Sequence, residues 1–123
     1  MKSLEYDTSK SGLEAVLKDW QIKAMQALWE SHEGETSRVV WERVNKMLGD
    51  ESISRASIIN FLDDMRNMKV LSAVDQTGKG GHHGVYSPAM DETELKRFLA
   101  ETLVKCLFAS FPDETLTVIQ KME

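Results

Sequence analysis

Residues 53–88 read ISRASIINFLDDMRNMKVLSAVDQTGKGGHHGVYSP, and the period of the apolar residues changes within this stretch. Its first half places apolar side chains three or four residues apart, as on one face of an amphipathic helix, at Ile58, Phe61, Leu62, Met65 and Met68. After residue 69 the period falls to two, four glycines lie within residues 77–84, and a second strand pattern ends at Pro88. The stretch therefore predicts a helix followed by an antiparallel hairpin with a long, flexible tip.

Two more helices are predicted before this stretch. Apolar residues recur at helical spacing from Leu17 to His32. Thr36 is the expected N-cap of a second helix that ends at Gly49, and Ser54 is the expected N-cap of the third. Three helices followed by a hairpin is the element order of a winged helix, in which the third helix enters the major groove of DNA.

The two ends of the chain extend this prediction. Residues 1–12 are polar and predict a flexible tail without a packing role. Asp91 and Glu94 resemble a capping box that opens a helix to about Ser110, and a short helix follows Pro112. We therefore expect a mainly α fold with a small antiparallel β-hairpin, made of a tail (1–12), a winged helix-turn-helix domain (13–90) and C-terminal dimerisation helices (91–123).

Composition excludes several classes of protein. The chain has 123 residues and one cysteine, so an internal disulfide and zinc fingers built on paired cysteines are ruled out. It contains neither the apolar run of a membrane span nor an N-terminal signal peptide, and a cytoplasmic protein is expected. The formal net charge is −5, yet residues 36–88 carry seven Lys or Arg against six Asp or Glu. Any contact with a polyanion is therefore expected in this middle segment.

Four stretches of the sequence resemble the penicillinase-repressor (BlaI/MecI-type) transcription regulators. They are AMQALWE at 24–30, TSRVV at 36–40, residues 53–71 and GVYSP at 84–88. The resemblance implies a DNA-binding repressor that occupies a pseudo-palindromic operator as a homodimer and occludes the promoter. The cysteine cluster of the copper-responsive members is not matched, and no residues specify the sensor-triggered cleavage of the antibiotic-response members.

Candidate DNA contacts lie on the second and third predicted helices. Arg55 presents a fork that fits guanine and Asn60 an amide that fits adenine, both in the half of a recognition helix that reaches base edges. Ser54, Ser57 and Arg38 suit phosphate contacts near helix N-termini. Helix capping would equally account for the two serines, and a plain surface position for Arg38.

The predicted hairpin tip carries Lys79, His82 and His83, which we interpret as contacts to the sugar–phosphate backbone. A metal site built on the two histidines is the alternative, but adjacent histidines in a loop lack the further ligands that a metal needs. No cofactor and no metal are therefore expected.

The first C-terminal helix is apolar on nearly every side in its second half. A helix of this kind must be buried, and the same helix of a second copy is the expected partner. The predicted dimerisation residues are Leu95, Phe98, Leu99, Leu103, Cys106, Leu107 and Phe111. Cys106 is expected to be a buried thiol, and the alternative for the whole region is that it folds back on its own domain.

No constellation of residues suits catalysis, so the chain is not expected to be an enzyme. The main rival to DNA binding is a winged-helix module that binds a protein without DNA. Ile59, Asp63 and Asp64 on the third helix favour this rival, whereas Arg55 and Asn60 favour DNA. A sensor that responds to a metal or ligand remains a further possibility, and the sequence names no effector.

Overall fold

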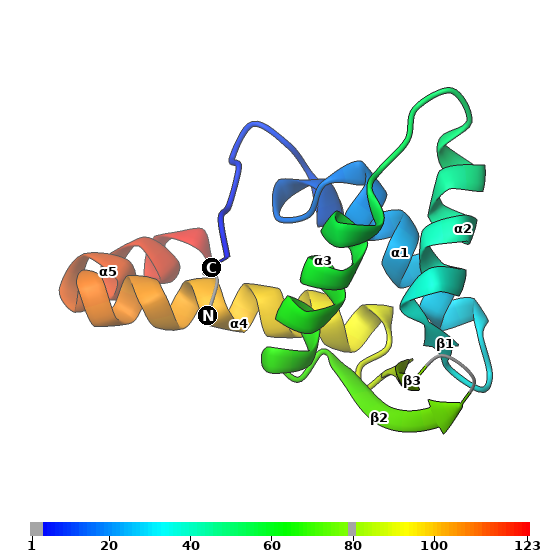
Figure 1. The fold of residues 1–123 in the computed structure, drawn as a ribbon. Coiled ribbons are helices and arrows are strands. Elements are labelled where there is room, and N and C mark those ends of the chain that lie inside the picture. The colour runs from blue at the N-terminus through cyan, green and yellow to red at the C-terminus, as the bar shows by residue number, and fades with distance from the viewer. Residues whose placement is uncertain (1–3, 79–80) are drawn as a thin grey trace. The chain divides into compact units, whose positions relative to one another are not determined.

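The computed structural model describes residues 4–78 and 81–123. The chain divides into two compact units, Met1–Asp91 and Glu92–Glu123. The fold is mainly helical with a small antiparallel sheet (Figure 1), which confirms the predicted fold class in its coarse form. None of the described helices is long and apolar enough to cross a membrane.

Three helices form most of the first unit: α1 (Asp19–Glu30), α2 (Ser37–Leu48) and α3 (Arg55–Asn67). The predicted N-caps are confirmed, because Thr36 Oγ1 accepts a hydrogen bond from the backbone N–H of Val39 and Ser54 Oγ accepts one from that of Ser57. Gly49 ends α2 with a φ of 69°, which glycine adopts without the penalty of a side chain.

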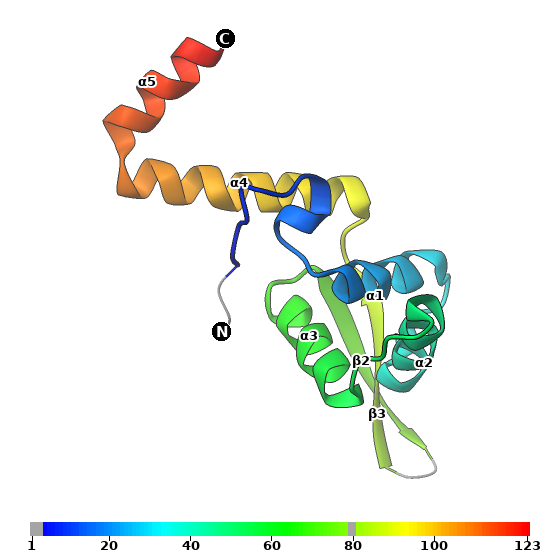
Figure 2. The same cartoon turned by 90° about the horizontal axis from the view of Figure 1, so that it is seen from above.

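A three-stranded antiparallel sheet completes the first unit. Its strands are β1 (Glu35–Thr36), β2 (Leu71–Gly78) and β3 (Gly81–Pro88), in the order β1-β3-β2. The hairpin β2–β3 was expected, but its strands run further than predicted and pair as far as Gly78 and Gly81, so its tip is shorter. Figure 2 shows the end of the hairpin extending beyond α2 and α3.

The core of the first unit lies where the helices meet the base of the hairpin. Trp20 stands edge-on to Phe61, with ring centroids 5.6 Å apart, and the indole N–H of Trp29 donates to the carbonyl of Met90 at 2.9 Å. Fully burying one large apolar side chain contributes about 1.5–3 kcal/mol. The largest fully buried side chains of the unit are Met25, Leu28, Val40, Val44, Ile58, Leu62, Val70 and Leu71.

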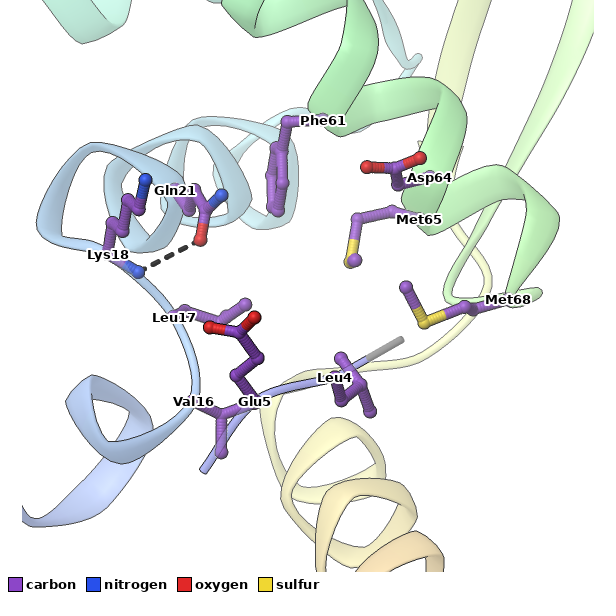
Figure 3. A pocket seen from close by; sticks show the side chains of 10 residues that line it. All are labelled: Leu4, Glu5, Val16, Leu17, Lys18, Gln21, Phe61, Asp64, Met65 and Met68. Atoms are coloured by element: carbon purple, nitrogen blue, oxygen red, sulfur yellow. Dashed lines mark hydrogen bonds between the residues drawn. The ribbon is translucent and has the colours of Figure 1, made fainter. Parts of the chain in front are cut away.

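The N-terminal segment differs from its prediction. The backbone N–H of Asp7 donates at 2.7 Å to the carbonyl of Ala15, the last residue of the short 3₁₀ helix η1 (Gly12–Ala15). Leu4 and Met68 face one cavity of about 90 Å³, shown in Figure 3. The prediction of a tail without a packing role is therefore wrong for residues 4–12. Because the apolar residues of this segment are few, their spacing shows no period.

The second unit consists of α4 (Glu92–Ser110) and α5 (Pro112–Met122), close to the predicted bounds. The hydroxyl of Thr115 donates to the carbonyl of Leu107 at 3.1 Å and is buried between the helices. Several large apolar side chains of this unit remain exposed: Val104, Leu107, Phe111, Leu116, Val118 and Met122.

Candidate nucleic-acid interface

The exposed side of α3 carries the two predicted base-contact residues. Arg55 occupies the first helical position and Asn60 follows more than one turn later, and both side chains are exposed. Ala56 is also exposed. It follows Arg55 directly and lies one turn before Asn60, so a small side chain stands beside both polar ones. This part of α3 therefore has both hydrogen-bonding groups and room for a close approach.

The two predicted serines serve the helix itself. Ser54 Oγ accepts from the backbone of Ser57, and the two side-chain oxygens lie 2.8 Å apart. The capping role that the sequence left open is therefore present. The cap satisfies the backbone N–H of Ser57 at the start of α3 and leaves contact with a phosphate as a prediction.

A small network that no sequence pattern predicted fixes where α3 begins. The indole N–H of Trp41 donates to the carbonyl of Ile53 at 2.9 Å, while Asn45 Oδ1 accepts from the N–H of Ile53 at 2.8 Å. Both side chains come from α2, so α2 holds the connecting segment at Ile53, just before α3 begins. An asparagine inside a helix is the one signal in the sequence, because its amide competes for backbone groups.

Cations on α2 have different surroundings. The guanidinium of Arg38 is exposed and forms an ion pair with Glu42 at 3.1 Å. Arg43 pairs with Glu35 at 3.3 Å and donates to the carbonyl of Ala27. An exposed ion pair between residues four apart on a helix is weak. Arg38 is therefore freer than Arg43 to reach a phosphate.

Asp63, which favours the protein-binding rival, has a partner on the sheet. The hydroxyl of Tyr86 on β3 donates to Asp63 Oδ1 at 2.8 Å. Tyr86 is buried, and this burial, followed by the hydrogen bond to the carboxylate, raises the pKa of its phenol to about 12. Tyr86 was not among the predicted site residues, because Asp63 lies 23 positions away and no local pattern links the two.

Asp64 lies on a different side of α3. It lines the cavity of Figure 3 together with Phe61 and Met65, opposite the N-terminal residues Leu4 and Glu5. The two neighbouring acids of α3 therefore meet different surroundings, one at the sheet and one at this cavity.

The predicted hairpin residues are only partly placed. Lys79 lies outside the described residues. His82 and His83 belong to β3 and pair along the backbone with Thr77 and Gln76, but their side chains are outside the described part of the chain. No metal-binding group of His, Cys, Asp or Glu occurs among the residues that were described.

The predicted dimerisation residues divide into two sets. Leu95 and Leu99 are buried in the single chain, and their role in a dimer stays a prediction. Phe98 and Leu103 are half-buried, whereas the last three are exposed: Cys106, Leu107 and Phe111. The expected burial of the Cys106 thiol is therefore wrong for the single chain. The second half of α4 packs against α5 and leaves Val104 and Leu107 exposed.

No protein-family model matches the chain, and no curated protein matches its sequence significantly. The likeness to penicillinase repressors therefore rests on the four stretches quoted from the sequence.

Proposed function

We propose that residues 13–90 form a winged-helix DNA-binding domain and that the chain is a sequence-specific transcriptional regulator, acting as a repressor. The observation that carries the proposal is the exposed polar side of α3, with Arg55 and Asn60, beside an antiparallel hairpin. Arginine and asparagine are the side chains that read guanine and adenine by paired hydrogen bonds.

The dimensions and support of α3 favour this use. The helix has 13 residues and is about 20 Å long, and a B-DNA major groove about 12 Å wide admits such a helix. Its inner side is buried through Ile58, Leu62 and Met65, and its start is held by the bonds of Trp41 and Asn45 to Ile53. A reading helix must be rigid in this way to fix the register of its contacts.

In the sequence, Asp63 and Asp64 favour a module that binds a protein without DNA. Their surroundings in the structure weaken this argument. The carboxylate of Asp63 is engaged by Tyr86, and Asp64 lines the cavity beside the N-terminal segment. Neither acid needs a protein partner to account for it. The protein-interaction module remains the second candidate because the chain as a whole is acidic.

The exposed apolar side chains of α4 and α5 support a homodimer. Val104 lies three residues before Leu107, and Phe111 lies four residues after it, so the three exposed side chains share one side of the end of α4. A second copy would cover this surface with the same residues, as a two-fold interface does. Two linked domains then bind two half-sites with an avidity that one domain lacks.

Selection of bound sequences from a random DNA pool, at two salt concentrations, tests the proposal. The full chain should enrich a palindrome, and an Arg55→Ala/Asn60→Ala variant should lose preference at particular positions. An Arg38→Ala variant is the matched control, because loss of a phosphate contact weakens all sequences alike. If the full chain enriches no sequence at low salt, the DNA-binding proposal is wrong and the protein-interaction module is favoured.

A further inference from the structure

The hydrogen bond from Tyr86 to Asp63 is the one described side-chain bond that joins the hairpin to α3. Tyr86 lies in the central strand and pairs with Glu35 on one side and Ala73 on the other. Its backbone is therefore held from both sides, and the rigid phenol sets where its hydroxyl lies.

Asp63 follows Asn60 by three residues, so the two side chains lie about one turn apart on neighbouring parts of the α3 surface. The carboxylate is half-exposed. Without a donor, a carboxylate at this place would be free to turn toward the phosphates of a bound duplex and would repel them. With the phenol as donor, it is turned toward the sheet.

We propose that Tyr86 is a positioning residue for DNA binding, which holds the Asp63 carboxylate toward the hairpin and away from the DNA backbone. The proposal rests on the DNA-binding function proposed above and deepens it. It explains how a helix with an acid beside its reading residues can approach a polyanion. Other charges near the phenol, Arg66 and Asp75, act on it more weakly than Asp63 does.

Substitution of the two residues, singly and together, tests the proposal. Tyr86→Phe removes only the hydroxyl and should weaken operator binding about tenfold at low salt, because the carboxylate is released. Asp63→Asn keeps an acceptor for the phenol without the charge, and should bind at least as tightly as the wild type. The double variant should recover wild-type affinity, since no charge remains to be positioned.

The salt dependence separates this role from a structural one. Repulsion between a carboxylate and phosphates is screened beyond about 10 Å at 0.1 M salt, so the defect of Tyr86→Phe should shrink as salt rises. A structural defect would persist at every salt concentration and in the double variant. Ser72→Ala is the matched control, because it removes a hydroxyl from the adjoining strand that bonds only within the sheet.

A measurement without DNA distinguishes failure of this proposal from failure of DNA binding. The chain has two tyrosines, so a Tyr6→Phe variant leaves Tyr86 as the one phenol observed by NMR. In this variant the ¹³Cζ shift of Tyr86 should begin to titrate at a lower pH when Asp63 is replaced by Ala. An unchanged titration, or wild-type operator affinity for Tyr86→Phe, overturns the positioning role alone. If the bond is found but the wild type binds no DNA, the proposed function fails and takes this role with it.

Discussion

Gly34 shows how one missing side chain permits the contact between two strands. Its φ is +81°, and a Cβ there would lie 2.5 Å from Ser87 Oγ and 2.9 Å from the carbonyl oxygen of Tyr86. Gly49 has a similar φ of +69° with nothing within 4 Å. The two positions therefore share a positive φ and differ in crowding.

Replacing each of these glycines by alanine should separate the two effects. Gly49→Ala should cost about 1 kcal/mol in free energy of unfolding, from the positive φ alone. Gly34→Ala should cost roughly 1–3 kcal/mol more, because its new methyl group displaces β3. Urea unfolding of both variants measures the difference, and equal losses would contradict the close approach of Gly34 to β3.

The phenol of Tyr86 makes stability depend on alkaline pH. Its pKa is raised to about 12 in the folded chain, mainly by burial, from about 10 in the unfolded chain. The unfolded state therefore loses its proton first. Stability is fully present below pH 10 and should fall between pH 10 and 12 by about 1.4 kcal/mol per pH unit.

Chemical unfolding at a series of pH values from 8 to about 11 would test this dependence. A Tyr86→Phe variant should show a shallower decline over the same range, since it has no phenol to ionise. Equal slopes for the two proteins would mean that the folded chain does not raise this pKa.

At the scale of elements, the N-terminal segment stabilises the first unit through a small apolar contact. Leu4 is half-buried beside the cavity lined by Met65 and Met68. Leu4→Ala should lower the free energy of unfolding by about 1 kcal/mol, less than for a fully buried leucine because part of its surface is already solvated. Thr8→Ala, exposed in the same segment, should have an effect within about 0.5 kcal/mol.

Local signals made the helices predictable. Thr36, Gly49 and Ser54 act on groups within three or four residues of themselves, and the structure has each in its expected place. The strand β1 was missed because two residues carry no period and its pairing partner, β3, lies some fifty residues later. The bond of Tyr86 to Asp63 was missed for the same reason, since it depends on packing between distant segments.

The site itself was less predictable than the fold. Exposure of Arg55 and Asn60 followed from the helical period, because the buried face of α3 could be identified in the sequence. The burial of Leu95 and the exposure of Cys106 did not follow, because a helix that is apolar on all sides gives no preferred face.

At the scale of the whole molecule, the expected assembly depends on the end of α4. Leu107→Glu and Phe111→Glu each place a charge in the surface that the proposed dimer buries, so either should yield a monomer at micromolar concentration. Ala109→Glu is the matched control, because this exposed residue points away from both. Sedimentation of the three variants and the wild type measures the effect. A monomeric wild type, or a dimer that tolerates both charges, would refute this interface.

The strands of the sheet differ in length, so the hairpin is supported by a third strand only at its base. Val85 has strand neighbours on both sides, in β1 and β2, whereas Gly84 is paired with β2 alone. Local opening of the hairpin should therefore begin between Gly84 and the tip and stop at Val85, the root of the hairpin, where β3 would have to separate from two strands together. Amide hydrogen exchange should be slower at Val85 and Tyr86 than at Gly84. A load on the end of the hairpin should therefore be resisted at this root, which packs against α3 and is bonded to it through Tyr86.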